Sequence, residues 1–157
     1  MPTIRLCGAT LAALLLSACA GQRAEPAHPA YVPQSRYVTV TTVALMVKEE
    51  AGVLPFLKKD FAKGGVLDGK EVYGFVPSTI TVAAGDTIHF HFVNPEDDEH
   101  NFVLRDLFVK LPGQTVVDTT YVPRVPGIYD FACAIPAHLP MMHGQLVVLN
   151  PEAVAAE

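Results

Sequence analysis

The chain has 157 residues, of which 50% are hydrophobic and 17% charged, and this length suits one domain better than two. Its 13 Pro and 11 Gly residues favour a strand-rich fold with many loops over a helical bundle. The 16 acidic residues outnumber the 11 basic ones, the formal net charge is −5, and Lys58-Lys59 is the only adjacent basic pair. Because Lys and Arg dominate binding to phosphates, this balance argues against nucleic acid as a partner.

The first eighteen residues predict an export signal. Residues 6–16 (LCGATLAALLL) form an apolar run of the length of a signal-peptide core, which is too short to span a bilayer as a helix. The run ends in Leu16-Ser17-Ala18-Cys19, which resembles a bacterial lipobox, where cleavage precedes a Cys that receives lipid. An ordinary secretory signal with a chance Cys is the alternative. We expect residues 1–18 to be removed and Cys19 to anchor the protein to a membrane, on the periplasmic side of the cell envelope.

The segment after Cys19 predicts a tether. Residues 20–36 are rich in Ala and Pro and have no apolar periodicity. We therefore expect residues 19–36 to form a flexible spacer, residues 37–150 to fold as one domain, and residues 151–157 to form a C-terminal tail.

Short strands separated by turns are predicted along the rest of the chain. Residues 38–47 are β-branched and partly alternating, and a short helix is predicted over 55–61, before Gly64-Gly65. Further strands are predicted at 72–75, 79–82, 87–93, 102–104, 107–111, 114–121, 128–133 and 145–149. Such short strands at regular spacing favour a β-sandwich or barrel.

The strand at 87–93 (TIHFHFV) has the clearest alternation in the chain. Ile88, Phe90 and Phe92 fall on one face, and His89 and His91 fall on the other. The two imidazoles could bind a second metal ion, because residues two apart on a strand point the same way. A solvated or hydrogen-bonded outer face is the simpler interpretation.

Three soft metal ligands lie on one predicted loop between two strands. Four residues separate Cys133 from His138, and three separate His138 from Met142. A second imidazole would complete a trigonal His₂Cys site with a weak axial thioether, which suits a copper ion that cycles between Cu(I) and Cu(II). His100, at the start of a predicted strand, is the favoured second imidazole. Structural zinc sites use four strong ligands and match less well.

The ordered motifs between Tyr73 and Leu149 resemble the cupredoxins, the blue-copper electron carriers typified by azurin, plastocyanin and pseudoazurin. The matching pieces are FVPSTITV at 75–82, AGDT at 84–87, HNFV at 100–103, YDFAC at 129–133, IPAH at 135–138 and MHGQLV at 142–147. The resemblance covers roughly half of the chain and implies an all-β Greek-key sandwich or barrel. Residues 38–70 have no matching piece, and we expect an extra strand and a short helical insertion there, near the N-terminal side.

The resemblance also implies the ligands of one copper ion. His100, Cys133 and His138 would be the equatorial ligands, and Met142 would be the axial ligand. Met141 is the alternative axial ligand. Because only Cys133 is present in this loop, a binuclear copper site, which needs two cysteines there, is excluded.

Three neighbours of the ligands are expected to support the site. By resemblance, Asn101 holds the two ligand loops together. Met141 contributes to an apolar surround of the second His, and His143 lies beside the site as a surface or accessory residue. Such outer groups orient ligands and tune reduction potentials.

The implied function is one-electron transfer between redox proteins of the envelope, such as a cytochrome, an oxidase or a reductase, without substrate turnover. The alternative is copper binding for tolerance or delivery, for which His28, His89, His91 and His143 are spare imidazoles. A copper oxidase or nitrite reductase would need a second, catalytic copper site. The acidic run Glu96–Glu99 is most simply a solvated loop, and otherwise it would attract a basic partner.

Overall fold

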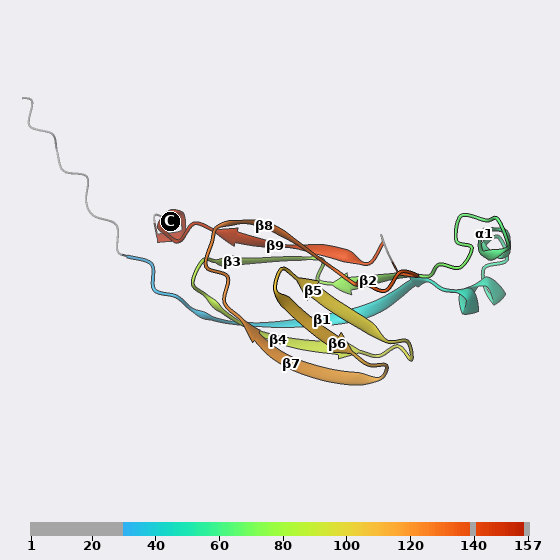
Figure 1. Cartoon of the computed structure of the whole chain (residues 1–157), viewed down its shortest axis with the longest axis horizontal. Helices are drawn as coiled ribbons and strands as arrows, with labels where there is room; N and C mark the ends of the chain where they lie inside the picture. Colours follow the sequence, from blue (N-terminus) through green and yellow to red (C-terminus); the bar gives the residue numbers. More distant parts are fainter. Residues whose placement is uncertain (1–29, 139–140, 156–157) are drawn as a thin grey trace, which may run out of the picture.

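The computed structural model describes residues 30–138 and 141–155, without the side chains of residues 49 and 50. The predicted signal at 1–18, Cys19 and most of the predicted tether lie outside the described residues. Two β-sheets face each other, and an insertion with two short helices extends from one end of them (Figure 1). This architecture confirms the prediction of an all-β sandwich with a helical insertion near the N-terminal side.

Both sheets mix parallel and antiparallel neighbours. The first has the order β2 (Val72–Val76), β1 (Ser35–Met46), β4 (Thr87–Asn94) and β7 (Thr115–Tyr121). The second has the order β3 (Thr79–Ala83), β9 (His143–Leu149), β8 (Gly127–Ala132), β5 (His100–Leu104) and β6 (Leu107–Leu111). Every predicted strand is present, with bounds that differ by a few residues.

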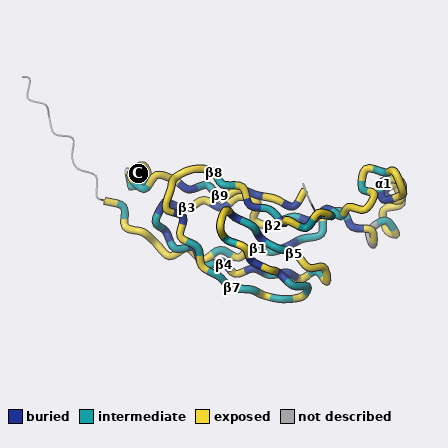
Figure 2. The backbone as a smooth tube through the Cα atoms, in the orientation of Figure 1, coloured by how far each residue is buried: buried dark blue, intermediate teal, exposed yellow. Residues whose placement is uncertain are grey.

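The inner faces of the sheets meet in an aromatic core, where the buried residues gather in Figure 2. Phe102 of β5 is central, with its ring centroid 4.8 Å from those of both Phe92 and Phe131. The alternation predicted for β4 is confirmed, since Phe90 and Phe92 are buried and His91 is exposed. Burying one such side chain stabilises the fold by about 1.5–3 kcal/mol.

The insertion between β1 and β2 contains a 3-10 helix, η1 (Lys48–Gly52), and one turn of α-helix, α1 (Leu57–Phe61). The predicted helix therefore begins two residues later than expected. Leu57 and Phe61 lie on one face of α1 and are its buried residues. Gly64 follows at a φ of 80°, a left-handed conformation that Gly adopts without strain.

The start of the domain differs from its predicted boundary because a buried carboxylate binds the segment before residue 37. Asp86 accepts hydrogen bonds from the Tyr31 hydroxyl at 2.6 Å, the Gln34 N–H at 2.8 Å and the Arg36 Nε at 3.0 Å. Residues 31–36 are thus part of the folded domain, and β1 begins at Ser35 rather than at residue 38. At the other end, the predicted tail contains a helical turn, α2 (Pro151–Ala155).

The strand pairing places three distant parts of the chain at one end of the second sheet. β8 runs antiparallel to both β5 and β9, with Val103 opposite Ala132 and Ala132 opposite His143. The start of β5, the end of β8 and the start of β9 therefore lie together. These are the points where His100, Cys133 and Met142 stand in the sequence.

Candidate metal centre

His100 follows a loop whose ends are joined by hydrogen bonds of Asn94. Asn94 is buried, its Nδ2 donates to the carbonyl oxygens of Asp98 at 2.8 Å and Leu111 at 3.1 Å, and its Oδ1 accepts from Thr42 Oγ1 at 2.6 Å. These bonds fix both ends of the loop between β4 and β5. His100 follows as the first residue of β5 and is fully buried.

The acidic run in this loop is more structural than the solvated loop of the simplest sequence interpretation. Glu96 accepts from the Ala44 N–H at 3.3 Å, Asp98 accepts from the Tyr73 hydroxyl, and Glu99 pairs with Lys110 at 2.8 Å. These partners come from three different strands, and their contacts depend on the pairing of those strands.

Cys133 and Met142 are joined through the backbone at the other side of the site. The Cys133 N–H donates to the Met142 oxygen at 2.9 Å, and the Met142 N–H donates to the His138 oxygen at 3.1 Å. The His138 N–H in turn donates to the Ile135 oxygen at 3.0 Å. The loop therefore turns back on itself and brings His138 and Met142 over the end of β8.

Two imidazoles and a thiol converge between these loops. The Nδ1 atoms of His100 and His138 are 3.1 Å apart, and Cys133 Sγ is 3.6 Å from His138 Nδ1. The ligand atoms of the three residues lie within 4.8 Å of one another, and all three residues are buried. In the described part of the chain this is the only such group of three or more His, Cys, Asp or Glu residues.

Burial keeps both imidazoles neutral. It lowers the pKa of His100 to about 4, an effect to which the neighbouring His138 adds, and it also lowers the pKa of His138. Two Nδ1 atoms at 3.1 Å share one proton at most, so at least one lone pair points into the cluster. The arrangement fits a metal ion that accepts both lone pairs.

The donor set fits copper better than zinc. Imidazole and thiolate suit copper, and a weak axial thioether is typical of electron-transfer copper sites. The two candidate methionines differ in burial, since Met142 is fully buried and Met141 is 51% exposed. Met142 is therefore the residue with the environment expected of an axial ligand.

Asn101 connects the two ligand-bearing segments. Its Oδ1 accepts a hydrogen bond from the Ala134 N–H at 2.6 Å. Asn101 directly follows His100, and Ala134 directly follows Cys133. This single bond joins the neighbours of two proposed ligands that come from different strands.

Tyr73 is a neighbour of the cluster that the sequence did not indicate. Its ring centroid lies 4.5 Å from that of His100 and 4.8 Å from that of His138. Burial raises the pKa of its hydroxyl, and the hydrogen bond to Asp98 raises it further, so the hydroxyl stays a neutral donor. Its buried neighbour Val72 and the half-buried Gly74 give no alternation that would single out Tyr73 in β2, so only the contact between Tyr73 and the ligand residues reveals its role.

The remaining described histidines lie outside the cluster. His89 stacks on Tyr37 at 4.6 Å, and His91 Nδ1 is 2.7 Å from an Asp118 carboxylate oxygen, both on the outer face of the first sheet. His143 is exposed at the start of β9. The structure thus favours the hydrogen-bonded outer face over a second metal site at His89 and His91.

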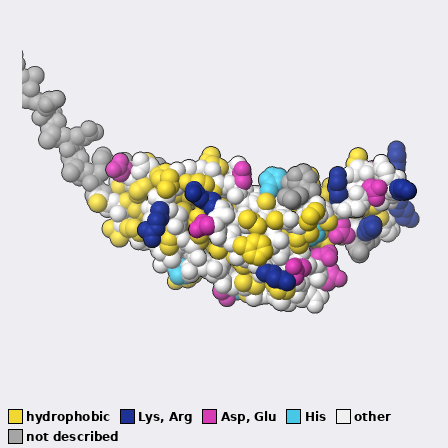
Figure 3. Space-filling view, in the orientation of Figure 1, with side chains coloured by type: hydrophobic (Ala, Val, Ile, Leu, Met, Phe, Trp, Pro, Cys, Tyr) yellow, Lys and Arg dark blue, Asp and Glu magenta, His cyan; other side chains and the backbone are white. Residues whose placement is uncertain are grey.

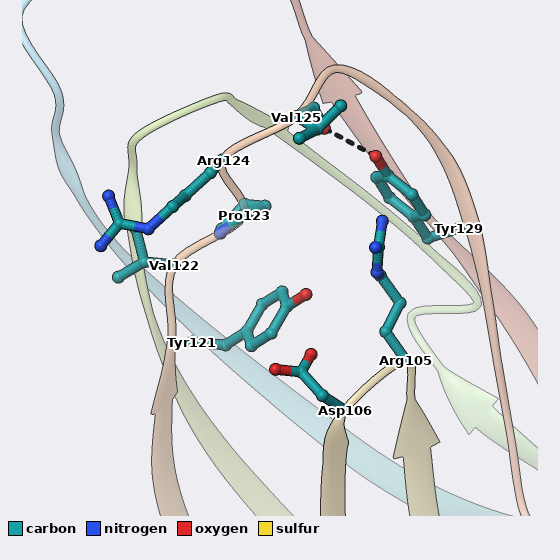
Figure 4. Close-up of a pocket in the computed structure, with 8 residues that line it drawn as sticks. All are labelled: Arg105, Asp106, Tyr121, Val122, Pro123, Arg124, Val125 and Tyr129. Carbon is teal, nitrogen blue, oxygen red and sulfur yellow. Dashed lines mark hydrogen bonds between the residues drawn. The ribbon is translucent and has the colours of Figure 1, made fainter.

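A separate cavity of about 240 Å³ lies at the opposite end of β5, beyond Leu104 (Figure 4). The Arg105 guanidinium stands 4.7 Å over the Tyr129 ring, and the Tyr129 hydroxyl donates to the Val125 oxygen at 2.8 Å. The residues that line it include no His, Cys or Met. This cavity therefore has no part in the metal centre.

The solved structures to which this chain is similar include several copper proteins. A copper nitrite reductase from Nitrosomonas europaea is 18% identical over 76% of this chain and 43% of its own, with a TM-score of 0.54. Auracyanin A, a "blue" copper protein from Chloroflexus aurantiacus, is 18% identical over 73% of this chain and 99% of its own, with a TM-score of 0.49. Auracyanin from Roseiflexus castenholzii is 22% identical over 48% of this chain and 87% of its own, with a TM-score of 0.44.

This chain thus spans less than half of the nitrite reductase chain. The similarity between the two shows that they share a fold and shows no more than that. No curated protein matches the sequence. The model of the cupredoxin-like domain family matches residues 61–148, more than half of the chain, and includes the whole His100, Cys133 and His138 cluster. The chain therefore belongs to the cupredoxin-like family.

Proposed function

We propose that this protein carries single electrons at one copper ion, which His100, Cys133, His138 and Met142 would hold. The convergence of two neutral imidazoles and one thiol in a buried site is the observation that carries the proposal. Copper bound there would supply a one-electron Cu(I)/Cu(II) couple.

The residues around the cluster support electron transfer rather than substrate turnover. The backbone bonds of the Cys133 loop and the Asn101 bond hold the donors in one arrangement, which limits rearrangement when the charge of the site changes. The buried, apolar surroundings exclude water and favour the lower charge of the reduced state.

His138 is the proposed route by which the electron leaves. It is 5% exposed, whereas His100 and Cys133 are fully buried. Its loop neighbours Ala134 and Pro136 and the nearby Met141 are exposed, which suits brief contact with a redox protein such as a cytochrome, an oxidase or a reductase. Leu139 and Pro140, which directly follow His138 in the sequence, lie outside the described residues.

Charges of both signs flank this end of the molecule. Figure 3 shows basic side chains over the insertion, where Lys58, Lys59 and Lys63 are exposed. Acidic side chains gather at the junction with the sandwich, near the loop that contains Asp97 and Glu99. Such charges would steer and orient a partner with complementary patches.

The proposed location is the cell envelope, on the periplasmic side, with lipid on Cys19 after removal of residues 1–18. The sequence around Cys19 supports this proposal. Among the described residues, no helix is long and apolar enough to cross a membrane. Labelling with a radioactive fatty acid, with Cys19→Ala as the unlabelled control, tests the anchor.

Copper stoichiometry and redox cycling test the proposal against copper handling. We expect one tightly bound copper ion per chain, which is reduced and reoxidised repeatedly without loss of metal. Binding of two or more ions, or ready surrender of the ion to a chelating acceptor, would instead favour a role in copper tolerance or delivery. In that case the imidazoles outside the cluster, those of His89, His91 and His143, would be the candidate binding sites for the extra ions.

A further inference from the structure

We propose that Tyr73 is a positioning residue that fixes the planes of both proposed imidazole ligands, an inference that rests on the proposed copper site. Tyr73 is 2% exposed and stands in β2, outside both ligand loops. Its ring meets His100 at an interplanar angle of 67° and His138 at 59°. One ring therefore contacts both imidazoles.

The three rings form a closed set. The centroids of His100 and His138 are 4.8 Å apart, and the Tyr73 centroid is 4.5 Å from the first and 4.8 Å from the second. An imidazole that turned about its bond to Cβ would move its Nδ1 atom away from the cluster. With Tyr73 in place, such a turn would bring the imidazole into collision with the phenol ring, because buried side chains are close-packed.

The phenol ring is itself fixed at its far end. The Tyr73 hydroxyl donates to the Asp98 carboxylate and lies 3.4 Å from a Glu71 carboxylate oxygen. The backbone oxygen of Asp98 is bound in turn by Asn94. The ring thus has two supports, the β2 backbone and the loop that precedes His100, and it cannot swing away from the imidazoles without losing one of them.

The consequence is a smaller change of geometry between the oxidised and reduced states. Electron transfer is fast when the ligands do not rearrange, and ligands are held best by neighbours whose own rotamers are locked. The phenol ring supplies this restraint from outside the ligand loops. Its contribution is separate from that of Asn101, which joins the loops to each other.

The test compares Tyr73→Leu with Tyr73→Phe and with Phe75→Leu. Tyr73→Leu removes the ring, and Tyr73→Phe keeps the ring contacts and loses only the hydroxyl. Phe75→Leu is the matched control, because Phe75 is also 2% exposed in β2 but packs on Phe102 and Phe131 instead of the imidazoles.

In the metal-free protein, NMR relaxation of the imidazole rings is the first readout. We expect rigid imidazoles in the parent, in Tyr73→Phe and in Phe75→Leu, and mobile imidazoles in Tyr73→Leu. In the copper-loaded protein, we expect the electron self-exchange rate to fall about ten-fold in Tyr73→Leu alone, because a looser site that adds about 1.4 kcal/mol to the activation barrier slows the reaction by that factor.

The outcomes separate this proposal from the proposed function. If the parent does not cycle copper, the electron-carrier proposal fails, and the NMR comparison still decides the role of Tyr73. If the parent cycles copper but Tyr73→Leu keeps rigid imidazoles and the parental rate, the role of Tyr73 is wrong. Equal changes in Tyr73→Leu and Phe75→Leu would likewise overturn it, because they would reflect general loosening of the core.

Discussion

Side chains at the proposed metal centre divide into the proposed donors and the groups that hold them. His100, Cys133 and His138 provide two nitrogens and one sulfur within 4.8 Å, and burial leaves the imidazoles neutral. Asn101 and Tyr73 add no donor atom to this set. Their contacts restrain the donors from two sides, through the neighbouring backbone and through the imidazole rings.

Replacement of Asn101 with Ala should destabilise the metal-free protein. The change removes the acceptor of the Ala134 N–H bond, and a bond of this kind contributes about 1 kcal/mol to the free energy of unfolding. Urea denaturation measures the loss. Asn101→Asp keeps an acceptor oxygen and should retain most of the stability, so an equal loss in both variants would contradict the role given to this bond.

The proposed donors and one of their supports, Asn101, could be expected from the sequence and its resemblance, whereas the other support, Tyr73, could not. Cys133, His138 and Met142 stand close together in one predicted loop, and soft ligands at that spacing indicate their own chemistry. Tyr73 acts on His100 across 27 residues of sequence, and its contacts exist only once β2 lies beside the ligand loops. No local pattern in the chain carries that information.

β9 begins in close contact with β8. A Cβ atom on Gly144 would lie 2.4 Å from the Phe131 ring and 2.4 Å from the Ser78 oxygen. Only Gly fits this position, which is two residues after Met142. The close approach of β9 to β8 and to the start of β3 therefore sets where the ligand loop ends.

Gly144→Ala should lower the free energy of unfolding by about 1–3 kcal/mol, because overpacking forces Phe131 or the backbone to move. Thermal or urea unfolding of the metal-free protein measures this change. Gly52→Ala is the matched control, since a Cβ atom there meets nothing within 4 Å. If the two variants were equally stable, the contact between β9 and β8 would not require Gly at position 144.

Asp86 makes the attachment of β1 dependent on pH. Burial opposes its ionisation, but the bonds from Tyr31, Gln34, Arg36 and the Ala83 N–H outweigh burial and lower its pKa from 3.8 to about 2. Because the folded-state pKa is lowered, this stabilisation is present above about pH 4 and is lost as pH falls through 2. It amounts to about 2 kcal/mol.

Asp86→Asn tests this dependence through the difference in stability from the parent. We expect the parent to be more stable at neutral pH and its advantage to shrink by about 2 kcal/mol between pH 4 and pH 2. Urea denaturation at a series of pH values gives the difference directly. An advantage that stays constant over this range would contradict the lowered pKa of Asp86.

Element types were predictable because their patterns are local, whereas some boundaries depend on distant partners. The alternation in β4 identifies both its faces, and Gly64-Gly65 comes shortly after the end of α1. The segment at 31–36 resembles a tether in composition, yet it is bound because Asp86, about 50 residues later, needs hydrogen-bond donors.

The whole molecule has two distinct ends. Ser35 of β1 pairs with Thr87 at the start of β4, and His100 follows the loop after the end of β4 at Asn94. The chain therefore enters the domain at one end, and the metal centre and the insertion lie toward the other (Figure 1). The exposed part of the His138 loop thus lies at the end opposite the one where the chain enters the domain.

The most direct test of the central claim is the optical and EPR spectrum of the copper(II)-loaded domain, compared with Cys133→Ser. A copper–thiolate bond predicts a strong visible charge-transfer band that bleaches on reduction, returns on reoxidation and is missing in the variant. A weak band that is the same in both proteins would place copper on histidines away from Cys133. That result would contradict both the ligand assignment and the role in electron transfer.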